Sequence, residues 1–384
     1  MYRFDEGIER RNTNCEKWDA DFVGNDVLPM WVADMDFEVS PAITERLVKA
    51  ANQGAFGYQL LPDEYYQAVM DFMKERHRFA VEKDWICYLP NVCLGLFLGV
   101  QTVSEIGDEI IIQVPVYGPF FKVVEESGRK LVQSRLINEN GHYTMDYADL
   151  ESKITERTKA LVLCNPHNPA GRVWTREELE CLVDVCKKHN ICIISDDIHS
   201  DIVAKGHKHT MVATICQEKG VKYICATSVS KPFNLASIHV ANFIIEDQKI
   251  REKFQYLIKA CHVGECNAFA EGALIGAYKE SIDWLNEMNA YVEANTDYFV
   301  KEIQENIPSL KVRKPEGTYL VWVDFSATDI APENLHEYLH KECKLLTEEG
   351  EFFGKYGKGF ERFNLACPRK NVEKAVEILK KYFG

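Results

Sequence analysis

The sequence lacks the stretches that mark several classes of protein. It has no basic stripe, and its 45 Lys and Arg are outnumbered by 59 Asp and Glu, which gives a net charge of −14. A phosphate backbone requires an electropositive face, so we expect no nucleic-acid partner. There is also no run of about 18 apolar residues and no apolar leader, so we expect a cytoplasmic protein without a membrane segment.

Disulfide and metal patterns are missing as well. The 13 cysteines are an odd number, and in a chain without an export signal we expect reduced thiols. Cys181, Cys186 and His189 do not form paired C-x-x-C knuckles, so we expect no metal site. The glycine-rich segment 354–359 lacks the strand and helix that flank a nucleotide loop, and it is interpreted as a turn.

What the sequence does contain is an alternation of strands and helices. Short apolar runs occur at 109–114, 160–164, 191–195, 223–227 and 241–245. Amphipathic stretches separate them, and the one over 175–189 begins with the capping pair Thr175 and Glu178. This pattern predicts an α/β fold with a mostly parallel sheet covered by helices.

The last quarter of the chain has an α+β pattern instead. A long helix is predicted over 284–307, ended by Pro308. Short strands are predicted at 311–312, 319–324 and 362–366. Because 384 residues exceed the usual size of one core, we predict a large domain of residues 48–283 and a small domain built from residues 1–47 and 284–384.

Polar residues follow three of the predicted strands. The segments are Asn165-Pro-His-Asn-Pro-Ala-Gly171, Ser195-Asp-Asp-Ile-His199 and Ser228-Val-Ser-Lys-Pro232. In open α/β sheets, ligands collect at the carboxyl ends of strands. Two aspartates at the end of an apolar strand require a partner, and a cationic ring nitrogen is one such partner. These segments therefore define one candidate site.

In this order and spacing, the three segments resemble those of fold-type I pyridoxal-phosphate (PLP) enzymes of the aminotransferase class I/II superfamily. Met30-Trp-Val-Ala-Asp-Met-Asp-Phe37, Phe56-Gly-Tyr58 and the histidine of Ser195-Asp-Asp-Ile-His199 resemble the cystathionine β-lyase branch of the MalY/PatB type. The resemblance covers nearly the whole chain. It implies a PLP-dependent transferase-like fold, PLP as the cofactor and a homodimer.

The resemblance gives Lys231 the central role. It would form a Schiff base with the cofactor and then act as a proton shuttle, and a turn after a buried strand supplies the desolvated position that this requires. Asp196, rather than Asp197, would pair with the pyridinium nitrogen and keep the ring an electron sink.

Three further residues are expected at the cofactor ring. Asn168 resembles the asparagine that hydrogen-bonds the phenolic oxygen, although a turn-stabilising asparagine is the alternative. His199 would lie near the same oxygen, or would be purely structural. Tyr117 resembles the aromatic residue that stacks on the ring, and a core aromatic is the competing interpretation.

The phosphate would be held without a glycine-rich loop. The N–H groups of Val92 and Cys93 are expected at a helix N-terminus, which binds anions. Ser228 and Ser230 would add hydroxyls, and Tyr58 would reach the phosphate from the neighbouring subunit of a dimer.

The sequence departs from the wider superfamily at one phosphate position. His239 stands where many members carry an arginine, which favours the lyase-like branch. On the substrate side, Arg362 resembles the arginine that grips the substrate α-carboxylate with its planar guanidinium. Ala33 and Asp34 are expected to line the mouth of the substrate site.

Two reactions are compatible with this core. A carbon–sulfur β-lyase would use Lys231 to remove the Cα proton and would cleave cystathionine, cystine or related cysteine S-conjugates to a thiol, pyruvate and ammonia. A class I/II aminotransferase would use the same lysine and return the proton to the cofactor. The resemblance over 30–37, 56–58 and 195–199 favours the lyase. A third hypothesis is a binding or regulatory protein that keeps the fold without catalysis.

Overall fold

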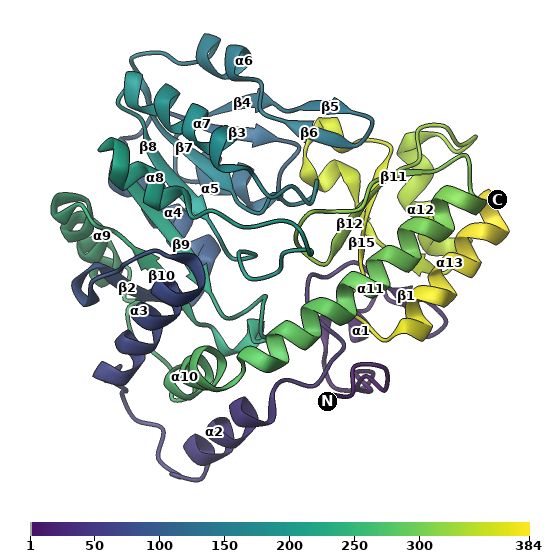
Figure 1. Ribbon diagram of the computed structural model, residues 1–384, viewed down its shortest axis with the longest axis horizontal. Helices are drawn as coiled ribbons and strands as arrows, with labels where there is room; N and C mark the ends of the chain where they lie inside the picture. Colours follow the sequence, from purple (N-terminus) through teal and green to yellow (C-terminus); the bar gives the residue numbers. More distant parts are fainter. Residues whose placement is uncertain (1) are drawn as a thin grey trace.

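The computed structural model describes residues 2–384, and its centre is a seven-stranded sheet (Figure 1). In spatial order the strands are β2 (Ile86–Leu89), β10 (Ala241–Ile244), β9 (Tyr223–Ser228), β8 (Cys192–Asp196), β7 (Thr158–Cys164), β3 (Glu109–Val114) and β4 (Lys130–Arg135). The five strands from β9 to β4 run parallel, and β10 is antiparallel to both of its neighbours. The predicted fold class is confirmed by this sheet and its helical cover.

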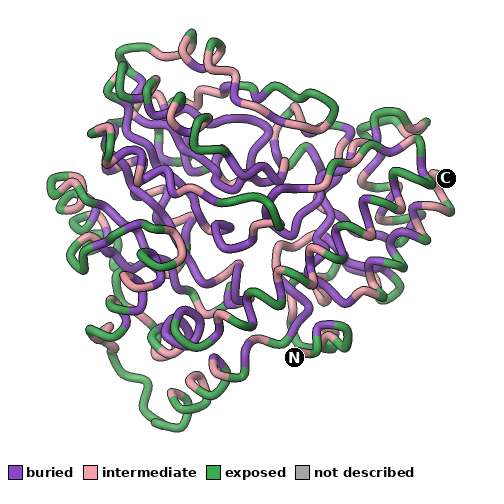
Figure 2. The backbone as a smooth tube through the Cα atoms, viewed as in Figure 1, coloured by how far each residue is buried: buried purple, intermediate pink, exposed green. Residues whose placement is uncertain are grey.

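Helices cover both faces of the sheet because alternate residues of each buried strand point to opposite sides. On β7, Leu161 and Leu163 pack with α7 (Arg176–Lys188) and α8 (Val212–Lys219). Val162 packs on the other face with α4 and its neighbours. That second layer is α4 (Val92–Val103), α5 (Pro119–Glu125) and α9 (Gln248–Ala260). Figure 2 shows the central strands buried between the two layers.

A second, four-stranded antiparallel sheet lies toward the chain termini. Its order is β11 (Lys311–Val312), β12 (Leu320–Asp324), β15 (Phe360–Asn364) and β14 (Glu348–Glu349). The long helix α11 (Ile282–Asn306) and α13 (Arg369–Phe383) pack on it. The N-terminal segment joins this region, because β1 (Leu28–Pro29) pairs with β13 (Leu345–Leu346) and Leu28 and Met30 enter the same core.

The remaining elements are short helices and one hairpin. They are α1 (Glu16–Asp19), α2 (Pro41–Ala51), α3 (Asp63–His77), α6 (Tyr147–Ser152), α10 (Ala270–Glu280), α12 (Leu335–Lys341), β5 (Ile137–Glu139) and β6 (His142–Thr144). Helices α2 and α3 both contact α10. The domain boundaries near residues 48 and 283 stay a prediction.

The predicted central strands agree with the observed ones to within two residues at each end. The capping box of Thr175 and Glu178 starts α7 as predicted. The predicted strand 362–366 is shifted, because β15 begins at Phe360 and ends at Asn364. Leu365 and Ala366 directly follow β15 and are also apolar and buried. Hydrophobicity alone therefore does not show that the strand ends at Asn364.

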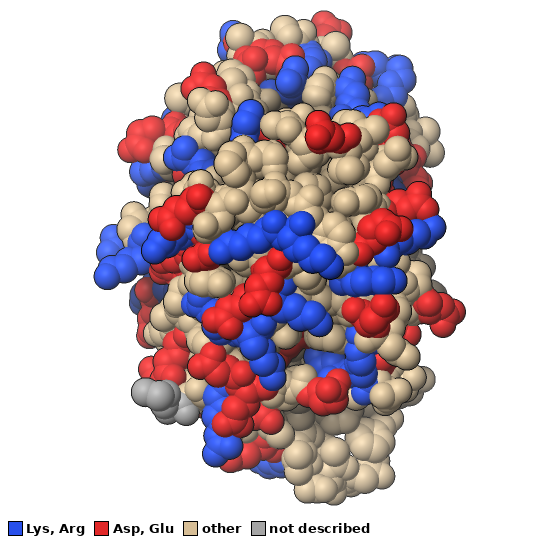
Figure 3. Space-filling view, turned by 90° about the vertical axis from the view of Figure 1, so that its right-hand side faces the viewer, with Lys and Arg blue, Asp and Glu red and all other residues tan. Residues whose placement is uncertain are grey.

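Three further features concern the surface charge, the helices and the cysteines. On the face shown in Figure 3, acidic and basic side chains lie interspersed. Within residues 2–384, none of the helices combines the length and the apolar character needed to span a membrane. The thirteen cysteines are free thiols, and the segment 354–359 forms short turns.

Candidate active site

A cavity of about 220 Å³ opens at the carboxyl ends of the central strands. It brings together every residue predicted for the cofactor except Tyr58. These residues are Val92, Cys93, Tyr117, Asn168, Asp196, His199, Ser228, Ser230 and Lys231. We call this space the inner cavity. Tyr58 lies away from it, in the segment between α2 and α3, with 93% of its surface exposed.

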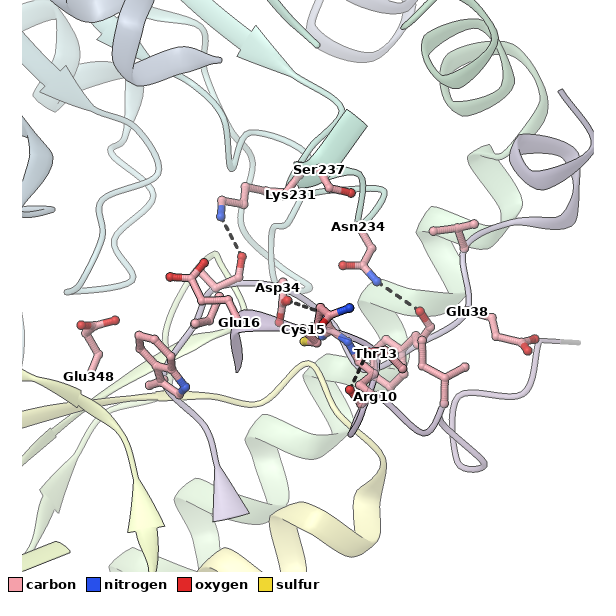
Figure 4. A pocket seen from close by; sticks show the side chains of 18 of the residues that line it. Arg10, Thr13, Cys15, Glu16, Asp34, Glu38, Lys231, Asn234, Ser237 and Glu348 are labelled. Carbon is pink, nitrogen blue, oxygen red and sulfur yellow. Dashed lines mark hydrogen bonds and ion pairs between the residues drawn. The ribbon is translucent and has the colours of Figure 1, made fainter. Parts of the chain in front are cut away.

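A larger cavity of about 1350 Å³ adjoins the inner one (Figure 4). We call it the outer cavity, and the two share Ala33, Tyr117, Lys231 and Ala236 as wall residues. All three residues predicted for the substrate side line the outer cavity, namely Ala33, Asp34 and Arg362. Lys231 therefore lies where a ligand in one cavity meets a ligand in the other.

Lys231 follows β9 and points toward the N-terminal segment. Its Nζ donates a hydrogen bond of 2.7 Å to the carbonyl oxygen of Ala33, drawn as a dashed line in Figure 4. Burial, and then the positive charge of Arg362, lower the pKa of Lys231. A lowered pKa increases the fraction of neutral amine, which is the nucleophilic form.

The two consecutive aspartates at the end of β8 have different surroundings. Asp196 lines the inner cavity, and its Oδ1 accepts a hydrogen bond of 3.1 Å from the N–H of Ile198. Burial raises the pKa of Asp196 to about 7. Asp197 instead accepts from Ser195 Oγ at 2.5 Å and contacts His209 Nε2 at 3.0 Å. Asp196 is the carboxylate available to a cationic ligand atom.

His199 and Asn168 supply polar atoms to the same cavity. The Nδ1 of His199 is buried and has no hydrogen-bond partner among the described residues. Burial lowers the pKa of His199, which favours the neutral ring. Asn168 Oδ1 accepts a hydrogen bond of 3.2 Å from Arg362 Nη1. An orphaned buried nitrogen beside an amide group fits a ligand that carries an oxygen atom.

The inner cavity is also lined by groups that could receive an anion. Helix α4 begins at Val92, and the first N–H groups of a helix have no acceptor within it. The hydroxyl oxygens of Ser228 and Ser230 are 2.8 Å apart beside it. Among the described residues that line this cavity, Lys231 is the only Lys or Arg. If a phosphate bound in this cavity, helix N–H groups and hydroxyls would balance much of its charge.

Arg362 is a buried and firmly held residue of the outer cavity. It is 1% exposed, and burial lowers its pKa. Its Nη2 donates to the carbonyl of Trp31 at 2.8 Å and to Glu348 Oε2 at 3.1 Å. Its guanidinium also lies 5.0 Å from the centre of the Phe353 ring. The side chain is therefore held on three sides within the small sheet.

The segment 31–37, which we call the N-terminal strap, lines the outer cavity, and its residue Ala33 borders both cavities. Asn364 Nδ2 donates to the carbonyls of Val32 and Asp34, each at 2.6 Å. Asn234 Nδ2 donates to the carbonyl of Met35 at 3.0 Å. Asp34 is also paired with Arg10 at 2.6 Å. The strap is therefore held from both sheets, by Asn234 after β9 and by Asn364 at the end of β15.

Sequence reasoning missed two residues that contact the site. Tyr319 donates its hydroxyl to the carbonyl of Ala33 at 2.9 Å. Glu348 faces Arg362 because the two residues are paired across β14 and β15. No local sequence motif marks either residue. The pairing of β14 with β15 reveals Glu348, and the path of the strap reveals Tyr319.

Comparison with known proteins places these observations in a family context. Residues 25–379 match the model of the aminotransferase class I and II family. The chain is 37% identical to cystathionine β-lyase PatB of Bacillus subtilis over 98% of each chain. A PLP-bound putative aminotransferase from Clostridium difficile 630 is 40% identical, with a TM-score of 0.97 over 100% of both chains. A PLP-bound C–S lyase from Staphylococcus hominis is 31% identical, with a TM-score of 0.93 over 100% of this chain and 98% of that one.

Proposed function

The chain belongs to the aminotransferase class I and II family, and on that premise we propose that it is a PLP-dependent carbon–sulfur β-lyase. It would convert cystathionine, cystine or a related cysteine S-conjugate, with one water, to a thiol, pyruvate and ammonia. From cystathionine the thiol is homocysteine. The observation that carries this proposal is the position of Lys231 at the junction of the two cavities.

The residues of the inner cavity fit PLP. The unpartnered Nδ1 of His199 and the amide of Asn168 suit its phenolic oxygen, and the face of Tyr117 suits its ring. Asp196 suits the protonated ring nitrogen, because a buried carboxylate requires a positively charged partner. When bound, PLP supplies an electron sink for negative charge at the substrate Cα.

Two further groups would hold the phosphate. The N-terminus of α4, at Val92 and Cys93, offers N–H groups to an anion, and Ser228 and Ser230 offer hydroxyls. Lys231 Nζ is the nucleophile that would hold the cofactor covalently.

The outer cavity would orient the amino acid. Arg362 would bind its α-carboxylate, and this fixes the Cα proton on the side of Lys231. Once the amino group of the substrate has displaced Lys231 from the cofactor, the freed amine would remove that proton as the general base. The hydrogen bond of its Nζ to the Ala33 carbonyl places the free amine at the wall that the two cavities share. The thiolate leaves from the β-carbon into the remaining volume of the outer cavity.

An aminotransferase is the second candidate, and one of the similar structures carries that description. We would incubate the PLP-loaded protein with cystathionine in the absence of any 2-oxo acid and measure thiol and pyruvate. Release of both in equal amounts supports the lyase. Transamination on addition of a 2-oxo acid, without thiol or pyruvate in its absence, contradicts it.

We further propose that the enzyme is a homodimer in which Tyr58 completes the neighbouring site. The segment between α2 and α3 exposes Phe56 (61%), Tyr58 (93%) and Leu60 (91%), which is unusual for three large apolar or aromatic side chains so close together. A second copy of the chain would cover them.

Hybrid dimers test this arrangement. Tyr58→Ala and Lys231→Ala proteins, each impaired alone, would be unfolded, mixed and refolded together. If Tyr58 serves the neighbouring site, half of the sites in a hybrid receive both residues and activity returns. Activity no higher than the sum of the two separate samples contradicts the proposal.

The free thiols also support a reducing compartment such as the cytoplasm.

A further inference from the structure

A glutamate lies in direct contact with the arginine that the proposed function assigns to the substrate carboxylate. Glu348 on β14 is paired across the sheet with Arg362 on β15. Its Oε2 is 3.1 Å from Arg362 Nη2, and both side chains line the outer cavity. Figure 4 shows Glu348 at this cavity. The Glu348 side chain is 19% exposed and the Arg362 side chain 2%. Glu348 is therefore the member of the pair that has room to move.

The hydrogen bonds of Arg362 identify where a second carboxylate could bind. Its Nη1 contacts the amide oxygen of Asn168, and its Nη2 contacts both the Trp31 carbonyl and Glu348. Its buried Nε has no partner among the described residues. Of the three acceptors, Glu348 is the one with a negative charge. A carboxylate that binds Arg362 through two nitrogens therefore meets Glu348 at close range.

We propose that Glu348 is a placeholder carboxylate: it neutralises Arg362 when no substrate is present, and it competes with the substrate carboxylate for the same guanidinium. Two carboxylates on one buried cation repel each other, so one must take up a proton or move away. Glu348 thus determines the affinity for amino-acid substrates. The inference rests on the proposed function through the role of Arg362 alone.

The surroundings of Glu348 favour proton uptake. The charged and titratable groups that face it are Arg362 on β15, His336 on α12, Glu349 on β14, Glu16 on α1 and Tyr117 before α5. Burial raises the pKa of Glu348, and the positive charges of Arg362 and His336 oppose that shift. At low pH the neutral acid does not compete for Arg362, whereas at high pH the ionised form does. Binding of a carboxylate therefore weakens as pH rises.

The test is calorimetric titration of the PLP-loaded protein with 3-(methylthio)propanoate. This ligand carries the carboxylate and the thioether but has no α-amino group, so it cannot displace Lys231. Glu348→Gln should bind it about fivefold more tightly than wild type near pH 8, the effect of one half-buried charge pair. The difference should shrink as the pH is lowered, because burial raises the pKa of Glu348 and favours its neutral form in acid. With cystathionine, the same variant should lower KM.

Glu349→Gln is the matched control, because it removes the same charge from the next residue of β14, which is exposed and lies outside both cavities. Its affinity should equal that of wild type. Weaker or unchanged binding by Glu348→Gln overturns the proposal, as does an equal gain in Glu349→Gln. Thermal unfolding verifies that each variant is folded. Wild-type binding that does not weaken as the pH rises from acid to alkaline overturns the proposal without any variant.

The two proposals can fail separately. If no cysteine conjugate releases a thiol but Glu348→Gln tightens the binding of 3-(methylthio)propanoate, the lyase assignment fails and the placeholder role stands. If thiol is released and the substitution leaves ligand affinity unchanged, the placeholder role fails and the lyase assignment stands.

Discussion

The inner and outer cavities are built in opposite ways. The polar residues of the inner cavity come directly after strands of one sheet: Asn168 after β7, Asp196 at the end of β8 and Lys231 after β9. The outer cavity joins chain segments that are far apart, as in the contact of Arg362 with the Trp31 carbonyl, which spans 331 positions. One rigid sheet thus positions the groups for chemistry, whereas contacts between the chain ends position the substrate. Changes in the inner cavity should therefore act on kcat, and changes in the outer cavity on KM.

Lys231→Ala should have the largest effect, because it removes both the nucleophile and the general base. We expect thiol release to fall by at least about 10³-fold. The visible absorbance of bound PLP should also be lost after dialysis. Lys222→Ala is the control, since Lys222 is an exposed lysine just before the other end of β9. A Lys231→Ala protein that keeps its absorbance and its turnover would remove the basis for assigning chemistry to the inner cavity.

Arg362→Lys should come next. It keeps the charge but loses the planar fork that binds a carboxylate at two points, so we expect KM to rise about 10²-fold. The kcat at saturating cystathionine should change far less. Arg313→Lys, at an exposed arginine beside β11, is the control. A fall in kcat with an unchanged KM would show that the outer cavity takes part in the chemistry, which contradicts separate roles for the two cavities.

Asp196→Asn should lower the rate about tenfold, because a neutral amide cannot keep the cofactor ring protonated. Its effect on the cofactor-free protein has the opposite sign. Burial raises the pKa of Asp196 from 3.8 to about 7, so between these values the folded state holds a proton that the unfolded chain has lost. Stability therefore falls as pH rises through this window.

This sign can be measured on dialysed, cofactor-free protein. Near pH 8 we expect Asp196→Asn to be more stable than wild type by roughly 1–3 kcal/mol, and near pH 5 the gain should shrink. The free energy of unfolding from denaturant titration at the two pH values provides the measurement. The exposed Asp329→Asn serves as the control. A variant less stable than wild type at both pH values would mean that the carboxylate is stabilised within the empty cavity.

Asn364→Ala should have the smallest effect. It removes the donor shared by the carbonyls of Val32 and Asp34 and so loosens the strap. We expect the free energy of unfolding to fall by about 1–3 kcal/mol and KM to rise a few-fold. Asn306→Ala removes an exposed amide from the end of α11 and should leave both unchanged. If kcat falls instead of KM rising, the strap positions Lys231 more than it positions the substrate.

The contrast between the cavities also explains how much the sequence could predict. The central strands and the residues that follow them were predictable, because an apolar run with a polar segment at its end is a local signal. The contact between Glu348 and Arg362 was not, because it depends on the register of β14 and β15. The contact between Tyr319 and the Ala33 carbonyl spans 286 positions and involves a backbone atom. The role of Tyr58 stays a prediction, because it requires a second subunit. The roles of the residues assigned to the phosphate also stay predictions.

One hydrogen-bond acceptor of the strap cannot be removed by side-chain substitution. The carbonyl oxygen of Ala33 accepts hydrogen bonds from both Lys231 and Tyr319. Every amino acid has such an oxygen, so no codon change at position 33 deletes it. Saturation mutagenesis would therefore report on the side chain at position 33 and not on this oxygen. Replacing the peptide bond after residue 33 with an ester, which weakens this oxygen as an acceptor, is the way to test a contact that ordinary mutation cannot remove.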